Sequence, residues 1–327
     1  MVLSGGHRRD RERSASGIEL DGDRVFAWCT ERSWRMDAQQ ISSALDAIGA
    51  LLEKTLVKPY EKNVLSKDQC IEIIDRSNQL TKRFGISVSN ARWSTLIDMM
   101  CFMTSKRETR SQKALTGAAI LNNMTFFLDD LSNDLVKDGA LEVVMDEIGK
   151  AVRDYYLPGD VDRVIAAARQ WATLDTIFRD SPTQKLLARS PYVYWQARTI
   201  ESGTHYFLVA TSPVYQNPKF SQLVDLMIPA QQAVKPTMLV NDLVSTYREK
   251  VYKEDYNYFL NFAGDMNRDM EDVKHNLEVI KSLGDDVSDI VLQKIYGNYL
   301  WARSSPRYRN EITDINCKLG ASGRATA

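Results

Sequence analysis

The stretch LNNMTFFLDDLSND, residues 121–134, is an almost uncharged helical sequence that ends in several carboxylates. Asp129 and Asn133 are four residues apart, as are Asp130 and Asp134, so each pair would share one face of a helix. Carboxylates packed this closely repel one another unless a cation lies between them. Oxygen ligands of this kind suit Mg²⁺, which takes a few carboxylates and completes its octahedron with water and phosphate oxygens. The pattern therefore makes Asp129, Asp130 and Asp134 candidate metal ligands.

We expect the helix to end within this acidic segment. Negative charge at a helix C-terminus opposes the macrodipole, so carboxylates in that place cost stability and call for a functional reason. An ordinary acidic helix end or loop is the alternative interpretation, because pairs of adjacent aspartates are common. On this stretch alone the structural interpretation is favoured.

Helical periodicity extends over most of the chain on either side of this stretch. One helix is predicted from apolar residues spaced by three and four that run up to a proline: Ile41, Leu45, Ile48, Leu52, Leu56 and Pro59. Further helices are predicted over residues 161–178, 192–209, 220–228, 233–251, 256–283 and 287–302, with a stop and a new start at Asp180-Ser181-Pro182. Long helices joined by short polar turns predict one all-α domain, residues 35–318, between flexible tails at 1–34 and 319–327.

Composition and charge fit such a domain. Of the 327 residues, 44% are hydrophobic and 26% are charged, and the formal net charge of −1 gives no reason to expect a nucleic-acid partner. No stretch approaches 18 uninterrupted apolar residues, so a transmembrane helix is not expected. The four cysteines are scattered and there are only three histidines, which makes a zinc site or a disulfide framework unexpected and a cytoplasmic setting the simplest interpretation.

A second polar pattern, NDLVSTYRE at residues 241–249, matches N-D-x-x-S-x-x-x-E in full. Asn241, Ser245 and Glu249 are spaced by four and four, so successive members advance by about 40° around a helix. Three oxygen-bearing side chains would line up and hold a second divalent ion. Arg248 directly precedes the glutamate and is expected to turn toward a phosphate, which its forked donors suit. Apolar residues directly before the pattern argue against a solvated helix face.

Taken together, the two patterns resemble the class I terpene synthase family, in which an aspartate-rich motif and an Asn/Ser/Glu triad hold three Mg²⁺ ions against a substrate diphosphate. The chain is similar in particular to bacterial diterpene cyclases of the cyclooctat-9-en-7-ol synthase type, from about residue 65 to residue 316. The similar stretches are VSNARW at 88–93, FRDSP at 178–182, IYGNYLW at 295–301 and RY at 307–308. The resemblance implies an all-α class I terpenoid synthase bundle around a central apolar cavity.

The resemblance also implies a phosphate-sensing arginine on a helix that breaks midway. Arg198 fits this role, and Gly203 is the expected break in helical periodicity. Glu201 stands where the family usually has an aspartate, which is a conservative departure. The carbonyl of Ser202 would then face the carbon that ionises.

Near the C-terminus, Arg307-Tyr308 resembles a family pair that contacts the diphosphate and the acidic motif when the site closes. The aspartate-rich motif departs from the usual pattern, because Asn133 stands where a third carboxylate is often found. Family members commonly bind metal through the first aspartate alone, so Asp129 is the firmest expected ligand. Asp130 and Asp134 have pairing with Arg307 as an alternative role.

The reaction implied by the resemblance is the ionisation of an allylic diphosphate. Mg²⁺ ions and Arg198, Arg248 and Arg307 would neutralise the charge that develops as the C–O bond breaks. Aromatic faces stabilise migrating positive charge by roughly 0.5–2 kcal/mol each. By similarity to the family, four aromatic residues are candidates for lining the cavity, with simple core packing as the alternative for each: Phe126, Phe178, Tyr206 and Trp301. No general base is assigned.

We therefore expect geranylgeranyl diphosphate as substrate and a polycyclic diterpene as product. Farnesyl diphosphate is the alternative substrate, since a few side-chain changes in a cavity alter chain length. A prenyl diphosphate synthase is less favoured, because those enzymes carry a second aspartate-rich motif in place of the triad. A non-catalytic helical scaffold would not account for the paired motifs, and the absence of a D-x-D-D motif disfavours a protonation-initiated cyclase. Whether the chain forms a homodimer is left open.

Overall fold

The two sequence patterns lie on two long helices, α5 (Gln112–Lys137) and α11 (Leu223–Tyr252). The structure is a computed structural model that describes residues 38–305, except 138, 179–182, 184–189, 218–222, 253–256, 263–264 and 285. The remaining helices are α2 (Ala38–Thr55), α3 (Lys67–Arg83), α4 (Asn90–Met103), α6 (Leu141–Val152), α7 (Pro158–Phe178), α9 (Pro191–Glu201), α10 (Thr204–Tyr215), α12 (Tyr258–Asn261), α13 (Met266–Ser282) and α14 (Asp286–Ser304).

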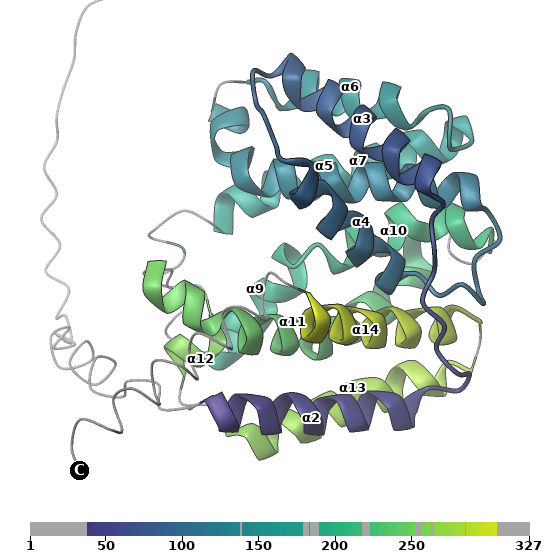
Figure 1. The fold of residues 1–327 in the computed structure, drawn as a ribbon. Helices are drawn as coiled ribbons and strands as arrows, with labels where there is room; N and C mark the ends of the chain where they lie inside the picture. Colours follow the sequence, from purple (N-terminus) through teal and green to yellow (C-terminus); the bar gives the residue numbers. More distant parts are fainter. Residues whose placement is uncertain are drawn as a thin grey trace, which may run out of the picture. The chain divides into compact units, whose positions relative to one another are not determined.

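Helix α10 connects the two motif helices in space. It packs against α5 and α7 on one side and against α11 on the other, while α11 also packs against α13 and α14. Figure 1 shows these helices with α3, α6 and α7 at one end of the described bundle and α2, α13 and α14 at the other. The described residues contain no strand, only an isolated bridge between Lys62 and Ser105. The predicted all-α bundle is therefore confirmed.

Local sequence signals explain where several helices begin. Ser66 and Gln69 form a capping box at α3, in which each side chain accepts a hydrogen bond from the other residue's backbone N–H. Ser89 caps α4 through its side chain, and Pro191 occupies the first turn of α9, where a missing N–H costs nothing. The predicted starts near residues 192 and 161 agree with α9 and α7.

Three predicted helix boundaries were wrong. The helix expected to end at 209 continues as α10 to Tyr215. We expected separate helices at 220–228 and 233–251, but α11 runs unbroken from Leu223 to Tyr252 with Pro229 and Pro236 inside it. Both prolines are buried, so packing against neighbouring helices outweighs the lost backbone hydrogen bonds. The predicted helix 256–283 is instead two helices, α12 and α13, and the second starts where the Asp265 side chain accepts from the N–H groups of Asn267 and Arg268.

The predicted end of the acidic helix was also wrong. Helix α5 continues to Lys137, so Asp129 and Asp130 lie about two turns before its end. Because the macrodipole acts mainly within the last turn, it does not explain these two residues. In the sequence the apolar spacing continues with Leu131 and Leu135, a pattern typical of a longer helix.

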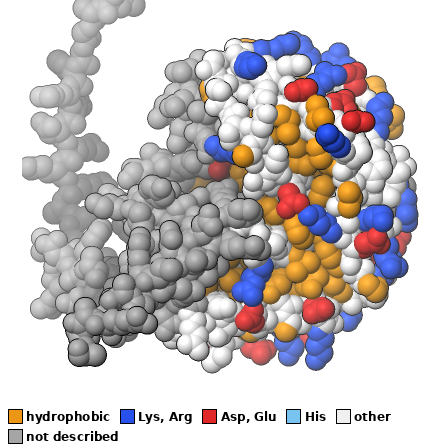
Figure 2. All heavy atoms as spheres, viewed as in Figure 1, with side chains coloured by type: hydrophobic (Ala, Val, Ile, Leu, Met, Phe, Trp, Pro, Cys, Tyr) orange, Lys and Arg blue, Asp and Glu red, His pale blue; other side chains and the backbone are white. Residues whose placement is uncertain are grey.

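The core and surface of the described part follow the expected division. Large side chains such as Trp93, Tyr194 and Phe259 are almost completely buried. Figure 2 shows acidic and basic side chains interspersed over the described part of one face, with apolar side chains exposed in its middle.

Among the described helices, none combines the length and the apolar character needed to cross a membrane. Both described cysteines, Cys70 and Cys101, are free thiols. The predicted tails and domain limits lie outside the described residues.

Candidate active site

The predicted triad lies on the middle and C-terminal part of α11. Because the helix is continuous there, Asn241, Ser245 and Glu249 advance gradually around it, as the spacing predicts. Ser245 and Glu249 are buried, and Asn241 is half-buried. All three side chains offer oxygen atoms as metal ligands, and only Glu249 offers a carboxylate. A Mg²⁺ ion held by this set would keep positions open for water and phosphate oxygens, so the donor chemistry fits the expected metal.

Asn257, which the sequence patterns did not single out, holds the triad from outside the helix. Its side-chain Nδ2 donates to Glu249 Oε2 at 2.6 Å and to the backbone carbonyl of Asp242 at 2.8 Å. Asn257 is completely buried and also caps α12, because its side-chain oxygen accepts from the N–H of Phe259. The carboxylate of Glu249 is therefore oriented before any ligand binds.

Burial dominates the electrostatics of Glu249. Loss of water around the carboxyl, together with the nearby charge of Asp242, raises its pKa to about 7, while hydrogen bonds from Asn257 and Ser245 and the charge of Arg198 act in the opposite direction. The ionised form is thus less favoured in the metal-free protein than it is for a solvent-exposed glutamate. A bound divalent cation would favour the ionised form, so the position is suited to a metal ligand.

Arg198 is buried at the C-terminal end of α9, beside the triad helix. Its guanidinium donates from Nη2 to Asp242 Oδ1 at 2.7 Å, from Nη1 to Glu201 Oε2 at 2.9 Å, and from Nε to the hydroxyl of Tyr194 at 2.9 Å. Only 5% of Arg198 is exposed. Such a cation needs paired anions in this setting, and two carboxylates supply them.

The predicted helix break is confirmed directly after this arginine. Helix α9 ends at Glu201, and α10 begins at Thr204. Gly203 has φ = 67°, a left-handed conformation that glycine adopts at little cost. A β-carbon at this position would lie 3.2 Å from Nε1 of Trp171, so the site is also close-packed. Ser202 lies in the turn, where its hydroxyl pairs with that of Thr204 at 2.8 Å.

Trp171 of α7 fixes the turn and was not predicted from the sequence. Its indole N–H donates to the backbone carbonyl of Glu201 at 2.8 Å, and its ring stacks on Tyr206 with centroids 5.7 Å apart. The hydroxyl of Tyr206 in turn accepts from Thr125 of α5 at 2.8 Å. Thr125 lies one turn before Asp129, so these contacts tie the break to the acidic helix.

The acidic motif is described in part. Asp129 is half-buried on α5, and Phe126, one turn earlier, is partly buried against the core. Asp130 and Asp134 lie on the same helix, but their side chains are outside the described residues. Their role as ligands stays a prediction. Among the described residues, no three His, Cys, Asp or Glu side chains cluster closely enough to hold a metal by themselves.

The remaining predicted site residues are placed unevenly. Tyr206 and Trp301 are buried, and Phe178 is half-buried at the last position of α7. The contact of these aromatic rings with a substrate stays a prediction. The side chain of Arg248 and the whole of Arg307-Tyr308 lie outside the described residues.

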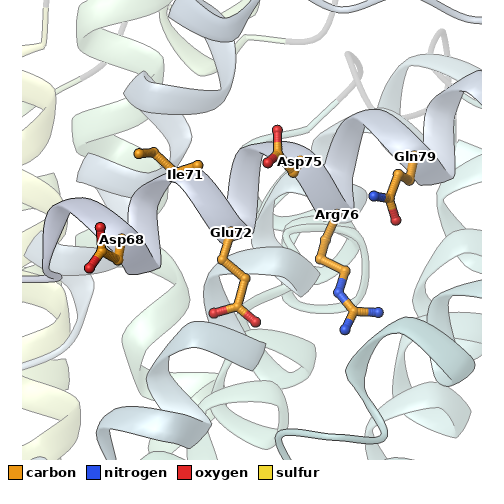
Figure 3. Close-up of a pocket in the computed structure, with 6 residues that line it drawn as sticks. All are labelled: Asp68, Ile71, Glu72, Asp75, Arg76 and Gln79. Atoms are coloured by element: carbon orange, nitrogen blue, oxygen red, sulfur yellow. The ribbon is translucent and has the colours of Figure 1, made fainter.

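A pocket on α3 is separate from this site. Its six lining residues all come from one helix, and Figure 3 shows their side chains projecting from α3: Asp68, Ile71, Glu72, Asp75, Arg76 and Gln79. Tyr155 donates to Glu72, and Arg76 pairs with Asp154 at 3.4 Å, so two of the four ionic side chains in this lining have partners on other segments. Ligand sites draw polar groups from several elements, and this groove does not.

Comparison with known proteins supports the resemblance drawn from the motifs. The chain is 27% identical over 278 residues to cyclooctat-9-en-7-ol synthase of Streptomyces melanosporofaciens, covering 82% of this chain and 90% of that protein. This chain resembles a bacterial terpene synthase. No family model matches it. Two solved structures of SVS_A2 mutants from ancestral sequence reconstruction are 14% and 15% identical to it, with TM-scores of 0.48 and 0.49, each covering 76% of this chain and 88% of the solved chain.

Proposed function

We propose that the chain is a class I terpene cyclase that ionises geranylgeranyl diphosphate with Mg²⁺ and cyclises the resulting carbocation to a polycyclic diterpene, releasing diphosphate. The similarity to cyclooctat-9-en-7-ol synthase over 82% of the chain carries this proposal. The geometry supports it. The buried Arg198 on α9, the break at Gly203 before α10 and the oxygen-bearing triad on α11 occur together.

Each group has a defined task in this reaction. Mg²⁺, when bound by Asp129 and the Asn241/Ser245/Glu249 triad, would supply the positive charge that makes diphosphate a good leaving group. Arg198 would donate hydrogen bonds to the diphosphate oxygens as negative charge develops there. Asn257 holds the Glu249 carboxylate in place, so little reorganisation is needed when the substrate arrives.

The carbocation must be kept from water and from nucleophiles. Apolar packing around the break serves this purpose, since Trp171 and Tyr206 are buried and stacked there. Aromatic faces that meet the migrating charge would stabilise it by roughly 0.5–2 kcal/mol each. We assign this role to Tyr206, Phe126, Phe178 and Trp301, as the resemblance implies. The shape of the expected cavity would then decide which carbons join.

The decisive assay incubates purified protein with Mg²⁺ and geranyl, farnesyl or geranylgeranyl diphosphate and analyses organic extracts by mass spectrometry. We expect cyclic product from the C20 substrate, lost in Asp129→Ala and in Asn241→Ala. Asp146→Ala, an exposed position on α6, is the matched control and should keep wild-type turnover.

Other results would select another function. Cyclic product from farnesyl diphosphate alone would make the chain a sesquiterpene cyclase. Accumulation of a longer linear diphosphate would identify a chain-elongating synthase. Absence of any turnover, together with absence of Mg²⁺-dependent diphosphate binding, would leave a non-catalytic scaffold.

A further inference from the structure

Asp242 is a carboxylate without a role in the triad pattern, yet it is completely buried in the middle of α11. An ionised group in such a place is stable only when hydrogen bonds and opposite charge replace water. Three donors do so here. Oδ1 accepts from Arg198 at 2.7 Å, and Oδ2 accepts from the Tyr194 hydroxyl at 2.5 Å and from the backbone N–H of Tyr258 at 3.2 Å.

These donors come from α9 and from the start of α12, so one carboxylate joins three segments. Tyr194 closes the arrangement, because its hydroxyl donates to Asp242 and accepts from Nε of Arg198. The edge of the guanidinium formed by Nε and Nη2 is thereby fixed to the triad helix. Arg198 and Asp242 are 44 residues apart in sequence. The ion pair therefore fixes the Arg198 guanidinium on α9 relative to α11.

The two acidic partners of Arg198 differ in their surroundings. Asp242 is wholly enclosed, whereas the Glu201 side chain is 14% exposed, lies on the same helix as the arginine and is next to the turn at Gly203. Separating Glu201 from Arg198 breaks a contact between two residues at the end of one helix. Releasing Asp242 leaves a buried charge without its cation, which costs far more.

We propose that Asp242 is the positioning residue that fixes Arg198 to the metal-binding helix, while the Nη1 edge beside Glu201 is the one that turns to the diphosphate. This inference rests on the proposed function, since it assigns how the sensing arginine is held for that reaction. Asp242 touches neither substrate nor metal in this assignment. It acts through Arg198, and Tyr194 acts with it as one unit.

The test compares Asp242→Asn, Tyr194→Phe and the double variant. Both single changes nearly preserve side-chain volume, so the fold has the best chance of surviving. We expect kcat with geranylgeranyl diphosphate to fall by about 10–100-fold in Asp242→Asn, as for other residues that orient a site, with KM changed much less. Tyr194→Phe should have a smaller effect, because the ion pair remains. The double variant should be no worse than Asp242→Asn, because the two residues act together.

Matched controls come from similar contacts elsewhere. Asp289→Asn neutralises one of the three carboxylates that pair with Lys58, and Tyr155→Phe removes the hydroxyl that donates to Glu72. Both controls should keep wild-type kcat. Calorimetric titration with inorganic diphosphate and Mg²⁺ should show the same number of binding sites per folded chain in Asp242→Asn as in the wild type, with weaker affinity.

Three results would overturn the assignment. Unchanged kcat in Asp242→Asn is one, and strictly additive losses in the double variant are another. The third is a fall in kcat that is matched by an equal fall in the number of diphosphate-binding sites per chain. That result would mean that Asp242 only maintains the fold. If Asp242→Asn does not fold, Tyr194→Phe still decides: a loss of kcat at full site number supports the assignment, and wild-type kcat overturns it.

The proposed function can fail independently. Wild-type protein that makes no cyclic product from any prenyl diphosphate refutes the cyclase, whatever the variants do. The positioning of Arg198 is then judged by diphosphate binding alone. Weaker binding in Asp242→Asn at full site number would support it, and equal affinity in the wild type and in Asp242→Asn would overturn it.

Discussion

Replacing Lys294 by methionine should stabilise this protein at neutral pH. Lys294 is buried in α14, and its ammonium nitrogen reaches the backbone carbonyl of Phe207 at 3.0 Å and the hydroxyl of Thr211 at 3.2 Å on α10. Among the described residues, no carboxylate forms an ion pair with it. The Thr211 hydroxyl also donates to the Phe207 carbonyl at 2.7 Å, so removing the lysine leaves that oxygen with a partner.

The magnitude follows from proton affinity. Burial lowers the pKa of Lys294 from 10.5 to about 7. The unfolded chain keeps the proton up to about pH 10.5, while the folded chain releases it near pH 7, so the stability of the wild type rises with pH between those values. The resulting penalty on the folded state is about 4 kcal/mol at pH 7 and about 1 kcal/mol at pH 9.5. Replacing Lys294 also removes its two hydrogen bonds, and each loss lowers the gain in stability by about 1 kcal/mol, independently of pH.

Lys294→Met should therefore be more stable than the wild type by about 2–3 kcal/mol at pH 7, and this advantage should shrink by about 3 kcal/mol at pH 9.5. Urea unfolding at the two pH values measures both quantities. Lys274→Met, on the exposed face of α13, is the control and should stay within about 0.5 kcal/mol of the wild type. An advantage that is the same at both pH values would refute the reasoning, because the charge would then not be its source.

Two further outcomes follow from the packing and the site. Gly297→Ala should destabilise the fold by about 3 kcal/mol in thermal unfolding, because its β-carbon would lie 1.8 Å from the backbone oxygen of Phe102. Gly159→Ala is the control: its β-carbon meets no atom within 4 Å, so the change should be neutral or slightly stabilising. Glu249→Gln should stabilise the metal-free protein at pH 8, where the wild-type carboxylate is ionised at a cost, since its pKa is raised to about 7. The same variant should lose thermal protection by Mg²⁺ with diphosphate, and retained protection would exclude Glu249 as a ligand.

Helical periodicity predicted most of the fold because it reports burial on one face. The patterns at 161–178 and 287–302 agree with α7 and α14 within a few residues. In α11 the prediction left a gap at 229–232 that contains Pro229, but packing of this buried proline outweighs its low helix propensity. The division between α12 and α13 was readable in principle, since Gly264 followed by Asp265 is a helix breaker followed by a capping residue.

Residues of the candidate site were predicted from helical spacing or, as for Arg198 and Gly203, from the family resemblance. The triad on α11 has such a spacing, and so does the acidic motif on α5. Asn257 and Trp171 reach the site from other segments, and no periodic pattern marks such contacts. Asp242 carried a signal that was missed, because a carboxylate surrounded by Leu239, Val240, Leu243 and Val244 needs a buried cation.

The placement of two carboxylates on α11 explains why only one of them is suited to a metal. Asp242 and Glu249 are seven residues apart, so they lie on nearly the same face, two turns from each other. Their charges oppose one another, which contributes to the raised pKa of Glu249. Arg198 forms an ion pair with Asp242 within the fold, whereas Glu249 accepts a hydrogen bond from the neutral side chain of Asn257 and is also influenced by the charge of Arg198. In the proposed function these two acids therefore differ: Asp242 is paired with a cation of the fold, and Glu249 would gain a cation together with the ligand.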